Sequence, residues 1–143
     1  MYMISACLLG HNCKYNGGNN RNEAALKFAE EHSYAAVCPE TEGGLKAPRE
    51  PAERQGNRVM SRSGEDWTEY FQQGARRSLK RAEETAEKAG EALEGAILKA
   101  RSPSCGYGKV YDGSFTGNTK DGDGCFAQLL REKGIPVKTE EDL

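Results

Sequence analysis

Three short apolar segments, far apart in the sequence, each lead to a cysteine at or just beyond their end. The segments are residues 2–9 (YMISACLL), 34–38 (YAAVC) and 95–99 (GAILK), and their cysteines are Cys7, Cys38 and Cys105. Segments of this length and composition predict buried β-strands. Residues 23–32 (EAALKFAEEH), between the first two, carry apolar residues at helical spacing. Strand, helix and strand in this order form the unit of a parallel sheet, so the sequence predicts an α/β fold.

Two further helices are expected to flank this sheet. One is predicted over residues 66–91, because apolar side chains recur along one face. That stripe consists of Trp67, Tyr70, Phe71, Ala75, Leu79 and Ala82. The other is predicted over residues 123–133 with Asp123 as its cap, and residues 135–139 (IPVKT) follow as a last short strand. The chain of 143 residues has the usual size of one domain, so residues 1–143 are expected to form a single one.

Two segments lack a simple period. Residues 39–63 hold several prolines and glycines, which predicts a long binding loop at the carboxyl ends of the strands. Within it, residues 58–60 (RVM) are a candidate edge strand. Arg49 is expected to pair with Glu53, and a role of Arg49 as a substrate anchor is the alternative. Residues 107–116 (YGKVYDGSFT) predict a β-hairpin with its turn near Asp112.

The composition excludes several classes of function. The formal net charge is −2, and no basic face large enough for duplex nucleic acid is evident. No apolar run approaches the about 18 residues that a membrane-spanning helix needs. The N-terminal residues carry no basic region of a signal peptide, so we expect a cytoplasmic protein. Five cysteines in that reducing compartment do not indicate a disulfide framework.

The three strand-end cysteines predict a metal centre. The carboxyl ends of parallel strands meet at one edge of a sheet, where ligands bind. Thiolates are the ligands that iron–sulfur clusters select, and three of them would leave one of four irons open to a substrate atom. Buried structural thiols and a zinc site are the alternatives. The sequence has no CxxC pair, and His11 and His32 show no ligand spacing, which disfavours zinc.

The motifs around these cysteines resemble a known family. They are SACLLG (residues 5–10), CPETEGGLKAPREPAE (38–53), AILKARSPSCGYGKVYDGSFTG (96–117) and GDGCFAQLLREKGIPV (122–137). In this order they are similar to the thiouracil desulfidases, a family long described as a domain of unknown function. The resemblance extends over nearly the whole chain.

The resemblance implies an activity and its residues. The activity is the non-redox conversion of 4-thiouracil to uracil and sulfide, at a [4Fe–4S] cluster held by the three strand-end cysteines. Glu40 of the CPE motif corresponds to the family's acidic catalytic residue. A serine of the SPSCG motif is also implicated, and Ser102 matches it better than Ser104. The expected partner is a small thiolated pyrimidine, bound by a monomer or a homodimer.

The chemistry permits a mechanism for these residues. The substrate sulfur would bind the open iron, and Glu40 would act as general base for a water that attacks the ring carbon. Ser104, Glu42, Ser5 and Tyr15 are the expected substrate contacts. A module that holds a cluster or metal without turnover, such as a sulfide carrier, is the alternative function.

Some residues depart from the family's pattern or have no role in this mechanism. Glu42 and Cys125 stand where the family more often has apolar residues, and Cys125 is interpreted as a core thiol on the last helix. Cys13 is interpreted as a free thiol near the cluster, with a spare cluster ligand as the alternative. Gly43 and Gly44 are expected to allow a close approach of the backbone near the metal centre.

Overall fold

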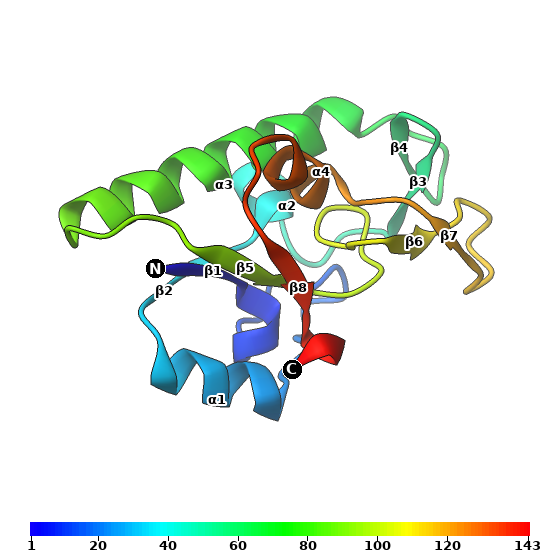
Figure 1. Ribbon diagram of the computed structural model, residues 1–143. Helices are drawn as coiled ribbons and strands as arrows, with labels where there is room; N and C mark the ends of the chain where they lie inside the picture. The colour runs from blue at the N-terminus through cyan, green and yellow to red at the C-terminus, as the bar shows by residue number, and fades with distance from the viewer.

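A parallel sheet of four strands forms the centre of the protein (Figure 1). The computed structural model describes all 143 residues. The strands stand in the order β2 (Tyr34–Val37), β1 (Tyr2–Ser5), β5 (Gly95–Leu98) and β8 (Val137–Thr139). Every neighbouring pair is parallel, and Ile4 of β1 stands between Ala36 and Ile97. This confirms the predicted α/β fold with a mostly parallel sheet.

Helices cover both faces of the sheet (Figure 1). α1 (Glu23–Glu31) lies on one face, whereas α3 (Thr68–Lys88) and α4 (Cys125–Glu132) lie on the other. The side chain of Asn22 caps α1 by accepting the amide of Ala25 at 2.9 Å, as capping residues do. None of the helices combines the length and apolarity that crossing a bilayer requires.

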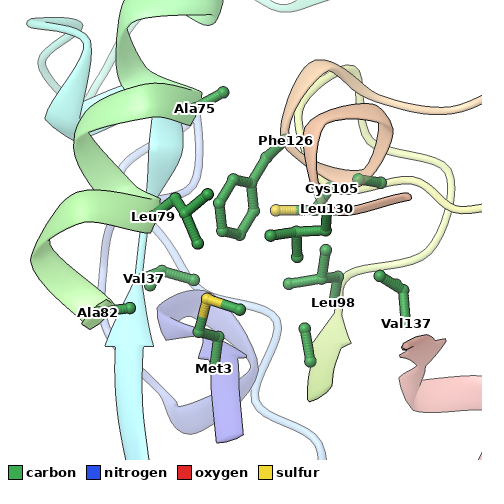
Figure 2. Packing of buried hydrophobic residues seen from close by; sticks show 12 residues of the cluster. Met3, Val37, Ala75, Leu79, Ala82, Leu98, Cys105, Phe126, Leu130 and Val137 are labelled. Carbon is green, nitrogen blue, oxygen red and sulfur yellow. The ribbon is translucent and has the colours of Figure 1, made fainter. Parts of the chain in front are cut away.

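Adjacent strand residues divide the core between the two faces, because successive side chains of a strand point in opposite directions. Met3 and Leu98 pack with α3 and α4, whereas Ile4 and Ile97 pack with Ala25 of α1. Figure 2 shows Phe126 of α4 reaching into the larger cluster. Full burial of such an apolar side chain contributes about 1.5–3 kcal/mol, so these contacts hold the sheet and its helices together.

The first predicted strand is shorter than expected. β1 ends at Ser5, and residues Ala6–Leu9 form a 3₁₀ turn, η1, that ends at Gly10 with φ 93°. An apolar run alone does not distinguish a strand from a buried helical turn. The turn places Cys7 just beyond the carboxyl end of β1.

The stripe predicted for the long helix is confirmed at most positions. Phe71, Ala75, Leu79 and Ala82 are buried on α3. Tyr70 is 46% exposed, because it lies about 100° around the helix from Phe71 and so outside the buried face.

The segment of residues 39–63 is less irregular than predicted, although residues 43–51 form no helix or strand. The segment contains a short helix, α2 (Pro39–Glu42), and a hairpin of β3 (Ala52–Gln55) and β4 (Arg58–Ser61). Pro39 occupies the first helical turn, a position that suits its fixed φ. The residues GN between β3 and β4 are a hairpin signal that the sequence analysis missed. The predicted strand at 58–60 lies within β4.

The hairpin predicted over residues 107–116 extends further along the chain than expected. β6 (Lys109–Tyr111) pairs with β7 (Thr119–Asp121), so the turn is longer than predicted. Asp112 begins this turn by accepting the amide of Ser114 at 2.9 Å. The chain ends in a second 3₁₀ turn, η2 (Glu140–Asp142).

Candidate functional site

A cavity of about 390 Å³ opens at the carboxyl ends of β1, β2 and β5. Four cysteines line it: Cys7, Cys13, Cys38 and Cys105. The structure therefore brings the three strand-end cysteines to one place, and adds a fourth thiol from the loop after η1. Cys125 is not among the lining residues.

Local structure fixes the backbone of each strand-end cysteine. The carbonyl of Cys7 accepts the amides of Gly10 at 3.2 Å and Asn20 at 2.9 Å. Cys38 caps α2, and its carbonyl accepts the first helical hydrogen bond. The amide of Cys105 donates to Ser102 Oγ at 2.7 Å.

The thiols differ in their affinity for protons. Burial raises the pKa of Cys7, and raises the pKa of Cys105 to about 12. The pKa of Cys38 is lowered, first because the Cys13 thiol donates a hydrogen bond to it and also because Thr41 does. The pKa of Cys13 is raised, because its thiol proton is held in this hydrogen bond to Cys38. Cys38 is therefore the thiol best prepared to bind a metal as thiolate.

The donor set suits a cluster better than a single ion. No three His, Cys, Asp or Glu side chains converge closely enough to hold one metal ion. The three thiols nevertheless lie near one another, because, in addition to burial, Cys38 raises the pKa of Cys7, and both of them raise the pKa of Cys105. In an iron–sulfur cluster each thiolate binds a different iron, so its ligands stand further apart than those of one zinc ion. This arrangement does not favour a zinc site, the alternative considered from the sequence.

Glu40 is held at both carboxylate oxygens. Its Oε1 accepts from Arg49 Nε at 3.2 Å and from Arg49 Nη2 at 3.0 Å, and its Oε2 accepts from Ser104 Oγ at 2.9 Å. The side chain of Glu40 is 17% exposed and that of Arg49 is 7% exposed. This partly buried carboxylate therefore has one orientation toward the cavity that it lines.

The two serines of the SPSCG motif have different surroundings. Ser102 is half-buried, and its Oγ accepts the amide of Cys105. Ser104 is buried and donates to Glu40. Their hydroxyl oxygens are 3.4 Å apart. Both residues line the cavity with Glu40.

The other predicted substrate contacts divide between two places. Ser5 and Tyr15 line the cavity, and Ser5 Oγ accepts the amide of Lys99 at 3.0 Å. Glu42 does not line it. Its carboxylate pairs with Arg81 of α3, in a separate groove beside β2.

The predicted ion pair within residues 39–63 was wrong. Arg49 pairs with Glu40. Glu53 instead accepts the amides of Gly113 at 2.9 Å and Phe115 at 3.1 Å. Its carboxylate thereby holds the turn between β6 and β7 against the first hairpin.

Known proteins share the sequence and the fold of this chain. Residues 2–142 match the 2-thiouracil desulfurase family. The chain belongs to this family. It is 38% identical to the uncharacterized protein YbbK of Bacillus subtilis, over 100% of this chain and 97% of that protein. It is also similar to the solved structure of the [4Fe–4S]-dependent thiouracil desulfidase TudS, with a TM-score of 0.86 and 40% identity over 99% of this chain and 91% of that one.

Membership of the 2-thiouracil desulfurase family makes the chain an enzyme. Sequence reasoning missed Lys99 and Arg62 around its cavity, and it gave Arg49 a different ion-pair partner. Arg62 packs over the ring of Phe115 at 5.6 Å. Lys99 pairs with Glu140 at 3.1 Å. No local pattern marks these contacts, because each joins segments that are distant in the sequence.

Proposed function

We propose that the protein removes the sulfur of a thiolated uracil by hydrolysis, using a [4Fe–4S] cluster held by Cys7, Cys38 and Cys105. The observation that carries this proposal is the position of three cysteines and Glu40 on one cavity. The similarity to TudS, named as a [4Fe–4S]-dependent thiouracil desulfidase, supports it. The reaction is written as thiocarbonyl plus water giving carbonyl plus hydrogen sulfide.

The three thiols suit the cluster chemically. When bound, a cluster with three protein thiolates supplies one iron without a protein ligand, a Lewis acid suited to the sulfur of the substrate. Cys38 binds as the thiolate that Cys13 and Thr41 already favour. The buried thiols of Cys7 and Cys105 release their protons on binding, because the positive charge of the metal takes the place of the proton on each sulfur.

Glu40 is the general base of the proposal. Its carboxylate takes a proton from the attacking water and returns a proton to the departing sulfur. Arg49 and Ser104 hold its two oxygens, so the carboxylate needs no reorientation before the reaction. Ser104 acts as a positioning residue in this arrangement.

Ser102 is the hydroxyl that faces the substrate. Its oxygen accepts the Cys105 amide, and its own hydrogen can turn from Ser104 Oγ, 3.4 Å away, to donate into the cavity. A donor at that place stabilises the oxygen that becomes negative when water adds to the ring carbon. Ser5 and Tyr15 remain proposed substrate contacts on the same wall.

All five cysteines are free, which suits a reducing compartment. We therefore retain the cytoplasm as the proposed location. A cluster-bearing sulfide carrier is the alternative that an activity measurement must separate, since it would bind the same cluster without turnover.

The test uses protein that is purified and reconstituted without oxygen. Iron and acid-labile sulfide are counted first, and the loaded protein is then incubated with 4-thiouracil or 2-thiouracil. We expect uracil and sulfide in equal amounts from the loaded protein and none from the cluster-free protein. A protein that holds the cluster but yields no uracil from either compound would favour the carrier.

A further inference from the structure

One nitrogen of Arg49 is buried without a hydrogen-bond partner. Nε and Nη2 donate to Glu40, and Nη2 also donates to the carbonyl of Cys13 at 2.9 Å. Nη1 has no partner, although the side chain is only 7% exposed. Folded proteins rarely leave a charged, buried donor unpaired, because the group has lost its hydration and gained nothing in return.

The position of this nitrogen indicates what completes it. Arg49 lines the cavity that also holds Glu40 and the cysteines. Nη1 belongs to the same planar group as Nη2, which is bonded to Glu40. Nη1 is the only nitrogen of this planar group that donates to neither Glu40 nor Cys13, so it is the donor left for a ligand bound in the cavity that Arg49 lines.

The chemistry of the pair favours a neutral ligand with an oxygen acceptor. Glu40 and Arg49 carry opposite charges at 3.0 Å, so the pair offers little net attraction to an anion. A guanidinium donates best to oxygen, in the plane of its own fork. A thiolated uracil is planar and uncharged, and it retains one carbonyl oxygen, separated from its thiocarbonyl group by one ring nitrogen.

We propose that Arg49 is a substrate-binding residue whose Nη1 donates to the remaining carbonyl oxygen of the thiolated pyrimidine. This inference rests on the proposed function and extends it from Glu40 to substrate selection. Nη1 is shielded in the structure, so the bond requires a small shift that opens Nη1 to the cavity while Nε and Nη2 stay on Glu40. The same side chain then orders both the general base and the ring on which it acts.

A substrate that lacks the carbonyl oxygen tests this contact directly. 4-Thiouracil is compared with pyrimidine-4-thione, which has the same thiocarbonyl and ring but no second carbonyl. For the wild-type enzyme we expect kcat/KM to fall about 10- to 100-fold with the second compound, because a buried donor is left unpaired. In Arg49→Lys, which keeps a cation beside Glu40, the two compounds should differ by no more than about twofold.

Binding provides a second measurement that needs no turnover. Titration calorimetry of the loaded protein compares uracil with pyrimidin-4-one. Wild type should prefer uracil by a similar factor, and Arg49→Lys should not. Arg58→Gln removes an exposed arginine of β4 outside the cavity and should behave as wild type in both assays.

The outcomes separate this inference from the proposed function. If Arg49→Lys keeps the cluster and retains the full preference for the carbonyl, Arg49 is not the contact and the inference fails. If wild type does not distinguish the two ligands, it fails as well. If wild type prefers uracil in calorimetry but releases no sulfide from 4-thiouracil, the proposed function fails while the contact stands.

Discussion

Gly74 of α3 lies directly against the carbonyl oxygen of Pro39, the residue that follows Cys38. A Cβ atom at Gly74 would stand 1.8 Å from that oxygen, and one at Gly43 would stand 2.0 Å from the carbonyl oxygen of Tyr70. The backbones of α2 and α3 are thus in contact through a glycine on each side. This contact fixes the helix that carries Glu40.

Gly74→Ala should displace α2 and loosen the metal centre. A methyl group cannot fit beside backbone atoms, so we expect a loss of about 1–3 kcal/mol in the free energy of unfolding. The iron retained per chain should fall with it. Urea denaturation and iron analysis measure the two effects. Lys80→Ala, an exposed change on the same helix, is the control; equal stability of the two variants would show that the contact is not tight.

Substitution of single cysteines should identify the ligands. Cys7→Ser, Cys38→Ser and Cys105→Ser should each lose the broad visible absorption and most of the iron after anaerobic reconstitution. Cys125→Ser should keep both, because Cys125 lies outside the cavity and instead accepts a hydrogen bond from Arg54 at 2.8 Å. Loss of the cluster in that variant would contradict the assignment.

The sheet and the meeting of the cysteines could be predicted because their signals are local. Each strand is a short apolar run, and parallel order follows from the helix between the first two. Gly43 and Gly44 were both expected to allow a close backbone approach near the metal centre. Gly43 does allow a close approach, but to Tyr70 of α3, and a Cβ atom at Gly44 would have no neighbouring atom within 4 Å. Gly74, the other glycine of the contact between α2 and α3, was not predicted to have such a role, because it lies within an ordinary helical pattern.

The errors have a common origin in segments whose partners are remote. The pairing of Arg49 with Glu40 depends on how the chain returns past α2, which no spacing encodes. Glu42 was expected to contact the substrate beside Glu40 because their segment was interpreted as a loop. In a helix, residues two apart point in different directions, so only Glu40 faces the cavity.

Asp123 should make the stability of the fold depend on pH. Its carboxylate accepts the Gly108 amide at 2.8 Å and pairs with Arg131 at 2.7 Å, which ties the loop after Cys105 to α4. It does not cap α4 as predicted, because Gly124 is the N-cap. Burial opposes ionisation, but Arg131 and Gly108 outweigh it and lower the pKa of Asp123.

A carboxyl group with a lowered pKa stabilises the fold above its unfolded pKa, about 3.9, and this contribution disappears as the pH falls through the folded value. Asp123→Asn should therefore cost about 0.5–1 kcal/mol near neutral pH, because the Arg131 side chain is 53% exposed and solvent screens the pair. The difference from wild type should shrink below about pH 4. Urea denaturation of cluster-free, reduced protein at several pH values measures it; a difference that does not change with pH would exclude the carboxylate as the cause.

Glu40→Gln and Glu42→Gln form a matched pair that tests the general base. The first variant keeps the shape of the side chain but cannot accept a proton, so we expect kcat to fall by about 10²–10⁴-fold while iron content is unchanged. The second removes only the ion pair with Arg81, whose side chain is 74% exposed, and should retain turnover close to wild type. Uracil formation from 4-thiouracil, normalised to iron, decides between them. Because both glutamates lie within one four-residue helix, a general disturbance of α2 would lower the two activities together, whereas loss of the base lowers only the first.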